Sequence, residues 1–377
     1  MSKIVLCNFC ADDQYSKISK YLLETQKDKV IQGMKQKAEL ISAEELAVLI
    51  PTGCTEEFAP EITVYYALES MITANAGAAI EVIKGKLPRP TVPDTKVKLT
   101  DKELTVITPE EAYALIQEKE SGIASKIFFI NTKSKSEVVE AIVGSKLSDI
   151  LEEKSVTASE KKGILLGGIR GKFVRAQELS EYVIEKDSLF DSITFFEKEE
   201  CMVEELKKLA QLIQSTSCGK CVLCREGSLQ YMTIVEEMTA GKAKMTDIDL
   251  LKEISEVIEI GAYCTFGQKM PGLMVTGLDL FKDEVEAHIK KKNCPAGVCS
   301  AFASYCILAK QCTGCEECLD ACPEDAIEGK KGFIHMINED FCTKCGKCVD
   351  ACDEGAIIKV TGVKPKVPMK LTKIGKF

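Results

Sequence analysis

The N-terminal half of the chain places short apolar runs between amphipathic segments, which is typical of an α/β fold. A helix is predicted over residues 137–143. We therefore expect α/β structure from the N-terminus to about residue 195. The apolar runs lie at residues 3–6, 46–50, 79–83, 104–107 and 126–130, and the last two are strand-like.

From about residue 196 the apolar positions change to a helical period. This change predicts a small helix bundle over residues 196–293. The expected fold class is therefore α/β followed by α, divided into several domains. The apolar residues recur at three-to-four spacing over 204–213, 229–238, 248–260 and 278–289.

The composition is that of an ordinary globular chain. Its 377 residues are 45% hydrophobic and 28% charged, which allows roughly two to four domains. The formal net charge of −9 argues against general nucleic-acid binding. No apolar run reaches the ~18 residues of a membrane span, and the stretch after Met1 is too short for a secretory signal.

Nineteen cysteines change this picture. Without a secretory signal, and with many of them in metal-ligand spacing, they indicate a reducing cytoplasm in which thiolates stay available for iron. We expect a cytoplasmic protein of an anaerobic host.

Two stretches near the C-terminus repeat one four-cysteine pattern, the second starting thirty residues after the first. In two-cluster ferredoxins, three cysteines of each run hold one [4Fe–4S] cluster and the fourth binds the other cluster. This spacing predicts single-electron chemistry. The predicted ligand sets are Cys312, Cys315, Cys318 and Cys352 for one cluster, and Cys342, Cys345, Cys348 and Cys322 for the other.

Structural zinc and a disulfide scaffold are the alternatives for eight cysteines in such a short stretch. Zinc ligands usually come as two pairs, and disulfide scaffolds belong to small secreted domains. The ferredoxin domain is expected over 307–360, with Asp353 standing where the first copy has Pro323. The lysine-rich tail over 361–377 is a solvated extension or a docking segment for an acidic partner subunit.

A third cluster is predicted in the helical segment. Three cysteines at two-residue spacing and one remote cysteine make another [4Fe–4S] cradle. Gly219 and Gly227 suit a tight wrap around a cofactor. The predicted ligands are Cys218, Cys221, Cys224 and Cys264.

The string from Ser217 to Gly227, with the distant Cys264, resembles the 51 kDa NADH-binding flavoprotein subunit of respiratory complex I. With the ferredoxin motifs added, the chain is more similar to the corresponding subunit of electron-bifurcating iron hydrogenases and NAD-dependent formate dehydrogenases. The resemblance implies an FMN domain, a ubiquitin-like β-grasp module, a helical cluster domain and a ferredoxin domain, in a complex of several redox subunits.

In that family a glycine-rich loop holds FMN and NADH, and this sequence contains no such loop. Of the family's nucleotide-contacting residues only Asn8 is kept, because Phe9, Cys10 and Ala11 replace those that follow it. Without the glycines, the backbone donors for the phosphates are missing. The resemblance thus implies that residues 1–95 are a truncated FMN-domain remnant binding neither FMN nor NADH, and that residues 96–195 are the β-grasp module.

Two smaller features of this half have competing interpretations. Gly167 and Gly168 follow a strand-like run, and a lone glycine pair there indicates a turn rather than a phosphate site. Cys7, Cys10 and Cys54 are expected to be buried free thiols, because most free cysteines in proteins are buried. A further cluster or a redox disulfide is the alternative for these three cysteines.

A zinc hinge is predicted over residues 294–306. One histidine and two or three thiolates make a tetrahedral zinc site. The preferred ligands are Cys201, His288, Cys294 and Cys299, with Cys306 as the substitute for Cys201. The alternative is a set of buried cysteines beside a hydrogen-bonded histidine. Such a metal would join the ferredoxin domain to the helix bundle.

The leading functional hypothesis is an electron-relay subunit of a cytoplasmic oxidoreductase complex. Electrons would pass between a flavoprotein or ferredoxin partner and another subunit through three [4Fe–4S] clusters. No acid, base or nucleophile constellation is recognisable in the chain, so the substrate chemistry is expected on a partner subunit. One alternative is an NADH-oxidising flavoprotein subunit of a complex, with or without electron bifurcation. A structural adaptor that keeps its clusters for folding is the other.

Overall fold

The computed structural model describes residues 2–92, 95–186, 190–361 and 364–377. The chain divides into two compact units. The first unit contains residues 1–235 and 246–281, and the second contains residues 236–245 and 282–377. In the described ranges, no helix is both long and apolar enough to cross a membrane.

A five-stranded sheet opens the first unit, in the order β3-β2-β1-β5-β4. Strand β1 runs parallel to β2 and β5, and β2 runs parallel to β3. Only the short β4 is antiparallel, to β5. The strands are β1 (Lys3–Asn8), β2 (Glu45–Pro51), β3 (Ile62–Ala67), β4 (Lys98–Leu99) and β5 (Lys102–Ile107).

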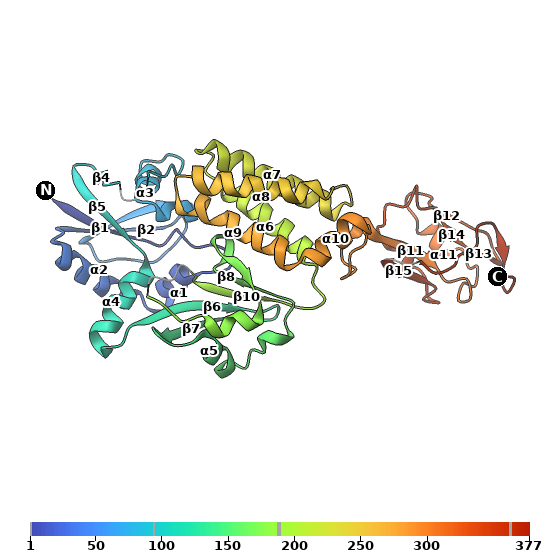
Figure 1. Cartoon of the computed structure of the whole chain (residues 1–377), viewed down its shortest axis with the longest axis horizontal. Coiled ribbons are helices and arrows are strands. Elements are labelled where there is room, and N and C mark those ends of the chain that lie inside the picture. Colours follow the sequence, from blue (N-terminus) through green and yellow to red (C-terminus); the bar gives the residue numbers. More distant parts are fainter. Residues whose placement is uncertain (1, 93–94, 187–189, 362–363) are drawn as a thin grey trace. The chain divides into compact units, whose positions relative to one another are not determined.

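Helices bury both faces of this sheet, as a parallel sheet requires (Figure 1). Successive side chains of β1 point to opposite faces of the sheet. Val5 and Cys7 belong to the apolar core on one face, and Ile4 and Leu6 belong to the core on the other. The first core includes residues of α1 (Ile18–Thr25), α2 (Lys27–Ile41) and α4 (Pro109–Ser121), and the second includes residues of α3 (Ala76–Ile83).

Helix α4 begins and ends at residues that the sequence marks clearly. Thr108 and Glu111 form a reciprocal capping box, and Pro109 is the first helical residue. Gly122 ends the helix with a left-handed φ of 71°. Helix α4 packs on α2 at Gly33, where an added Cβ would lie 1.8 Å from the Ala112 carbonyl oxygen.

A second sheet of the first unit has the order β7-β6-β10-β8-β9. The last strand, β10, pairs in parallel with β6 and antiparallel with β8. The chain thus forms a hairpin, a helix and an antiparallel pair, and its final strand inserts between the hairpin and that pair. The elements are β6 (Ser125–Asn131), β7 (Ser136–Ile142), α5 (Leu147–Glu153), β8 (Gly163–Leu166), β9 (Lys172–Val174) and β10 (Ser192–Phe196).

Two segments differ from their expected structure. Residues 137–143 were predicted to be helical, but most of them form β7, in which Val139 and Ala141 are buried and Glu140 and Ile142 are exposed. That alternation has the period of a strand. The run 104–107 was expected in the β-grasp module, but it lies in β5 and pairs with β1 of the first sheet.

The helical segment contains five helices. The fourth begins at Thr265, ahead of the expected run 278–289, and that run is divided at Phe281 between the fourth helix and the fifth. In the first unit, α7 and α8 approach closely at Gly227, where an added Cβ would lie 2.3 Å from Ile258 Cδ1. The helices are α6 (Met202–Thr216), α7 (Val222–Thr239), α8 (Thr246–Gly261), α9 (Thr265–Leu280) and α10 (Lys282–Lys290).

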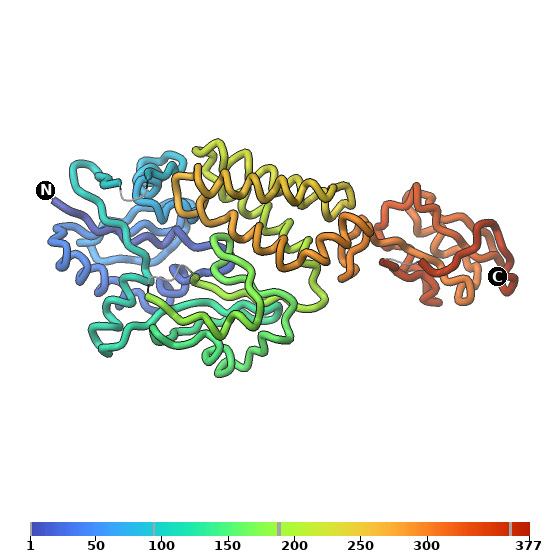
Figure 2. Tube along the Cα trace, viewed as in Figure 1, coloured from blue at the N-terminus to red at the C-terminus, as the bar shows by residue number. Residues whose placement is uncertain are grey.

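The second unit after α10 is built from short elements around the cysteine motifs. Figure 2 shows the backbone course of this part of the chain in orange and red. Strand β11 (Ala303–Ile307) pairs antiparallel with β15 (Ile357–Thr361). The C-terminal β16 (Thr372–Lys373) returns to pair with β13 (Phe333–Ile334). The remaining elements are β12 (Ile327–Glu328), β14 (Met336–Ile337), α11 (Glu317–Asp320) and α12 (Lys347–Asp350).

Candidate iron–sulfur and metal sites

The two ferredoxin motifs have the same backbone course. Three positions adopt left-handed φ angles in both copies, although in each pair only one residue is glycine. Residues with a Cβ adopt this conformation rarely, so the loops require it at these positions. It also recurs in the backbone concavities around iron–sulfur sites. The pairs are Gly314 (68°) and Lys344 (60°), Glu316 (76°) and Gly346 (83°), and Asp325 (50°) and Gly355 (59°).

The structure brings Cys352 of the second motif to the first three cysteines of the first motif. Burial, and then the nearby thiols, raise the pKa of Cys318 to about 12. These neighbouring thiols belong to Cys312, Cys315, Cys352 and Cys348, in that order of effect. Cys312 and Cys318 are buried, whereas Cys315 is exposed.

The reciprocal arrangement holds around Cys348. Burial raises its pKa, and Cys342, Cys345 and Cys322 add to the increase as nearby thiols. The Ala326 N–H donates a hydrogen bond to Cys322 Sγ at 3.3 Å. Two groups of thiols are therefore gathered, and each contains the fourth cysteine of the other motif.

A third group of thiols lies in the first unit between the loop before α7 and the start of α9. Burial, and then Cys264, Cys221 and Cys218, raise the pKa of Cys224 to about 11. Ser217 Oγ lies 3.6 Å from Cys224 Sγ, and the Tyr263 N–H donates to Cys221 Sγ at 3.5 Å. Cys264 is the N-cap residue of α9. Four soft thiol ligands, with backbone and hydroxyl donors to sulfur, fit a [4Fe–4S] cluster.

Asn8 stands where the family has a nucleotide-contacting asparagine, but its side chain hydrogen-bonds to residues of this chain. Asn8 is 1% exposed. Its amide donates to the Thr73 carbonyl at 2.9 Å and to Thr73 Oγ1 at 3.1 Å, and its oxygen accepts from the Cys10 N–H. The Asn8 side chain therefore ties the end of β1 to the segment at residue 73.

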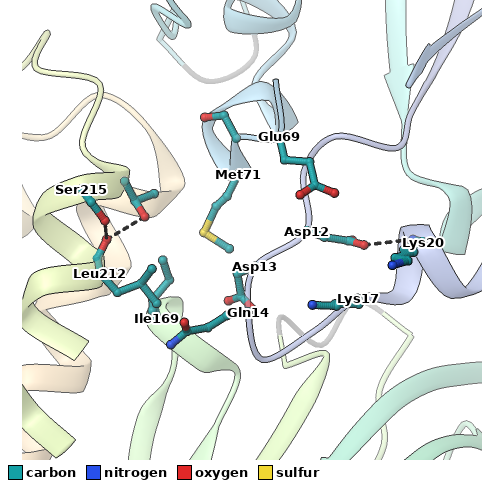
Figure 3. Close-up of a pocket in the computed structure, with 12 residues that line it drawn as sticks. Asp12, Asp13, Gln14, Lys17, Lys20, Glu69, Met71, Ile169, Leu212 and Ser215 are labelled. Atoms are coloured by element: carbon teal, nitrogen blue, oxygen red, sulfur yellow. Dashed lines mark hydrogen bonds between the residues drawn. The ribbon is translucent and has the colours of Figure 1, made fainter. Parts of the chain in front are cut away.

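The cavity beside the loop after β1 is lined by charges of both signs, because Lys17 and Lys20 lie on its wall together with carboxylates (Figure 3). It has a volume of about 410 Å³, and Asp12, Asp13 and Glu69 bring three carboxylates to its wall. Asp12 accepts the N–H groups of Ser19 and Lys20 at the N-terminus of α1, at 3.1 and 3.0 Å. A protein carboxylate thus occupies the helix end that would otherwise favour a phosphate.

Cys7 and Cys10 lie in different apolar cores, so their sequence spacing does not bring them to one site. Cys7 is fully buried in the core beneath α2, and Cys10 lies in the core on the opposite face of the sheet. Burial raises the pKa of Cys10 to about 12, after which Glu69, Asp12 and Cys54 add to the increase. Separation across the sheet is the reason why the Cys7–Cys10 spacing does not make a metal site.

In the second unit, His288 on α10 lies beside two cysteines. His288 Nδ1 is 2.8 Å from the Glu284 carbonyl oxygen, and its Nε2 is 3.4 Å from Cys299 Sγ. The ligand atoms of His288, Cys294 and Cys299 lie within 4.8 Å of one another, and all three residues are buried. A histidine oriented by a carbonyl on one nitrogen and facing thiols with the other suits zinc.

The other two residues named for this metal belong to different elements. Cys201 is part of the first unit, where it is 1% exposed and accepts the Glu204 N–H as the N-cap of α6. Its role as the fourth ligand stays a prediction. Cys306 lies on β11 opposite Ile358, and among the described residues it is not part of the group around His288.

Comparison with protein families finds two iron–sulfur regions. Residues 204–288 match the NADH-ubiquinone oxidoreductase-F iron-sulfur binding region. Residues 311–357 match a 4Fe-4S dicluster domain. All twelve predicted cluster ligands fall inside these two matched regions. The chain therefore carries iron–sulfur-binding domains.

Curated relatives share part of the chain. The NADP-reducing hydrogenase subunit HndC of Solidesulfovibrio fructosivorans is 40% identical over 135 residues, which are 36% of this chain and 28% of that protein. The mitochondrial NADH-ubiquinone oxidoreductase 51 kDa subunit of Aspergillus niger is 28% identical over 100 residues, which are 26% of this chain and 20% of that protein. The chain thus aligns with less than a third of the length of these relatives.

A solved structure shares the fold. An NAD+-reducing [NiFe]-hydrogenase in the H2-reduced state has a TM-score of 0.68 at 17% identity, covering 77% of this chain and 56% of that chain. The likeness confirms a mixed α/β architecture of several domains. Over the matched regions the chain is therefore related to the 51 kDa subunits of NADH oxidoreductases and to hydrogenase subunit HndC, and residues 311–357 match a 4Fe-4S dicluster domain.

Proposed function

We propose that this protein is an electron-transfer subunit of a cytoplasmic oxidoreductase complex and that it carries three [4Fe–4S] clusters. It relays electrons between a flavoprotein or ferredoxin partner and another redox subunit. The ligands are Cys218, Cys221, Cys224 and Cys264; Cys312, Cys315, Cys318 and Cys352; and Cys342, Cys345, Cys348 and Cys322.

The observation that carries this proposal is the exchange of the fourth cysteine between the two motifs. Cys352 lies with the thiols around Cys318, and Cys322 lies with those around Cys348. Structural zinc sites usually take their ligands as pairs, whereas each motif here offers three cysteines at two-residue spacing and a fourth to the other motif. Exchange between motifs is the ligation pattern of two-cluster ferredoxins, whose role is single-electron transfer.

The substrate chemistry belongs to a partner subunit in this proposal. The carboxylates of the cavity in Figure 3 and the internal bonding of Asn8 support a sheet that holds no FMN or NADH. The sheet then serves as a packing scaffold for the cluster-bearing segments.

The proposal also includes one zinc ion on His288, Cys294 and Cys299, with Cys201 as the fourth ligand expected from the sequence. The buried, closely spaced ligand atoms of the first three residues support it. Replacing Cys299 with serine should remove the zinc and leave the iron content unchanged, as measured by elemental analysis. Retention of stoichiometric zinc in that variant would contradict this ligand set.

Anaerobically purified full-length protein tests the relay function. We expect about twelve iron atoms per chain and reversible reduction of three clusters by dithionite, followed by electron paramagnetic resonance (EPR). Clusters that dithionite cannot reduce would instead indicate a structural adaptor. Stoichiometric FMN, together with bleaching of the iron–sulfur absorbance by NADH, would overturn the relay in favour of a flavoprotein.

A further inference from the structure

His335 lies in the ferredoxin-like unit between β13 and β14, and it is only 1% exposed. Its Nδ1 is 3.8 Å from Cys312 Sγ. Its Nε2 is buried and has no hydrogen-bond partner among the described residues. Among the described residues, the buried imidazole of His335 therefore makes its polar contact with Cys312, a proposed cluster ligand.

Gly329 provides the space for the ring. A Cβ added at this glycine would lie 1.6 Å from His335 Cδ2 and 2.6 Å from Cγ. Gly329 is not one of the glycines with a left-handed φ. Its lack of a side chain therefore matters for the imidazole that packs against it.

The position of the proton follows from the two nitrogens. A neutral imidazole carries one N–H, which is inferred from the hydrogen-bonding partners. A proton on Nε2 would leave a buried donor unsatisfied and turn the Nδ1 lone pair towards an anionic thiolate. A proton on Nδ1 instead gives Cys312 Sγ a donor, and this is the lower-energy arrangement.

The equivalent position in the other motif has no imidazole. Tyr305 precedes Cys312 by seven residues, as His335 precedes Cys342. Tyr305 lies near the other thiols, since burial and then Cys348, Cys345 and Cys342 raise its pKa. No hydrogen bond from its hydroxyl to sulfur is found in the described part of the chain. The two thiol groups therefore differ at one symmetry-related side chain.

We propose that His335 donates an Nδ1–H···S hydrogen bond to Cys312 and thereby raises the reduction potential of the cluster held by Cys312, Cys315, Cys318 and Cys352. Reduction adds one electron to an already anionic cluster, and a donor to a ligand sulfur stabilises that added charge. The inference rests on the proposed cluster ligation. His335 is a positioning residue that acts through Cys312, and it makes the two neighbouring clusters unequal.

Redox titration of the intact holoprotein, followed by EPR, tests this role. In His335→Leu the affected cluster should show an approximately tenfold lower ratio of reduced to oxidised form at the same ambient potential. For a one-electron couple this corresponds to about 59 mV. His335→Asn keeps an N–H at the same distance from the backbone and should restore most of the shift. Tyr305→Phe is the matched control and should leave this cluster unchanged.

A spectroscopic readout separates the hydrogen bond from general packing. The chain has two histidines, so 15N-histidine labelling marks only His288 and His335. Pulsed EPR of the reduced protein should detect a 15N coupling that disappears in His335→Leu and weakens in Gly329→Ala, where the added methyl displaces the ring.

The outcomes distinguish the two proposals. About twelve irons in every variant, with unchanged potentials and no 15N coupling, would overturn the role of His335 and leave the relay intact. An iron content far below twelve in the unaltered protein would instead refute the cluster assignment itself.

Discussion

The sheet around β1 and the cysteine loops of the second unit differ in how their residues are buried. The sheet has strands of six or seven residues at its centre, between helices on both faces. In the second unit, helices α11 and α12 have four residues each, and β12, β13 and β14 have two. Among the described residues, the apolar core around the two cysteine motifs contains eight buried residues, and three of them are cysteines.

This contrast indicates two sources of stability. The sheet buries enough apolar surface to fold through its own core, whereas so small a core usually needs a metal or a cross-link. The segment that resembles a flavin domain can therefore persist without a ligand. The ferredoxin-like loops should depend on iron for their structure, and three experiments test that difference.

The largest effect is expected from Cys322→Ser. It should remove the cluster bound by Cys342, Cys345 and Cys348, lowering the iron content by about four atoms. Hydrogen exchange should increase most around the second motif, although the substitution lies in the first. Cys306→Ser is the control, a buried thiol of the same unit outside the ligand sets. Greater exchange around residues 312–318 than around 342–348 would contradict the exchanged ligation.

A core substitution in the sheet should affect stability without affecting iron. Leu49 on β2 is fully buried, so Leu49→Ala should destabilise the sheet by about 2–5 kcal/mol. Denaturant-dependent hydrogen exchange of β1 and β2 peptides measures this change. Leu68, which is 80% exposed, is the matched position, and Leu68→Ala should have little effect. If Leu49→Ala also released iron, the two regions would not be independently stabilised.

The smallest effect is expected from the buried carboxylate Asp13. Burial, and then the Asp191 carboxylate, raise the pKa of Asp13 to about 6. Because the folded chain binds the Asp13 proton more tightly than the unfolded chain does, protonation of this carboxyl favours folding at low pH. This contribution to stability is lost as the pH rises through about 6 and the buried carboxyl ionises. Asp13→Asn should therefore stabilise the first unit by about 1 kcal/mol at pH 8 and by less at pH 5.5.

The Asn side chain can still accept the Tyr15 and Ser16 N–H groups, which Asp13 Oδ1 binds at 2.7 and 2.8 Å. Asp101→Asn, at an exposed position, should show no such pH dependence. Hydrogen exchange of the β1 peptide at both pH values provides the comparison. A constant difference between Asp13→Asn and the unaltered chain would show that the carboxylate does not titrate in this range.

Local sequence signals predicted several features correctly. Three of the four helical runs lie within α6, α7 and α8, because helical periodicity is a property of neighbouring residues. The fourth run, 278–289, covers most of α10 but only the last three residues of α9. The glycine pair at residues 167–168 forms a turn with left-handed φ angles, as expected. Residues 137–143 were assigned wrongly because a short run of β-branched and charged residues fits either period until a partner strand is known.

By itself, the sequence determined the cysteine spacing, which predicts cluster ligands, and showed that this chain contains no glycine-rich loop, since both features depend on residues close together along the backbone. Only the tertiary structure decided that Cys7 and Cys10 lie on opposite faces of a sheet, that Asp12 occupies the N-terminus of α1, and that His335 contacts Cys312. Each of these placements depends on how distant segments pack and on strand register, which the order of residues along the chain does not give directly.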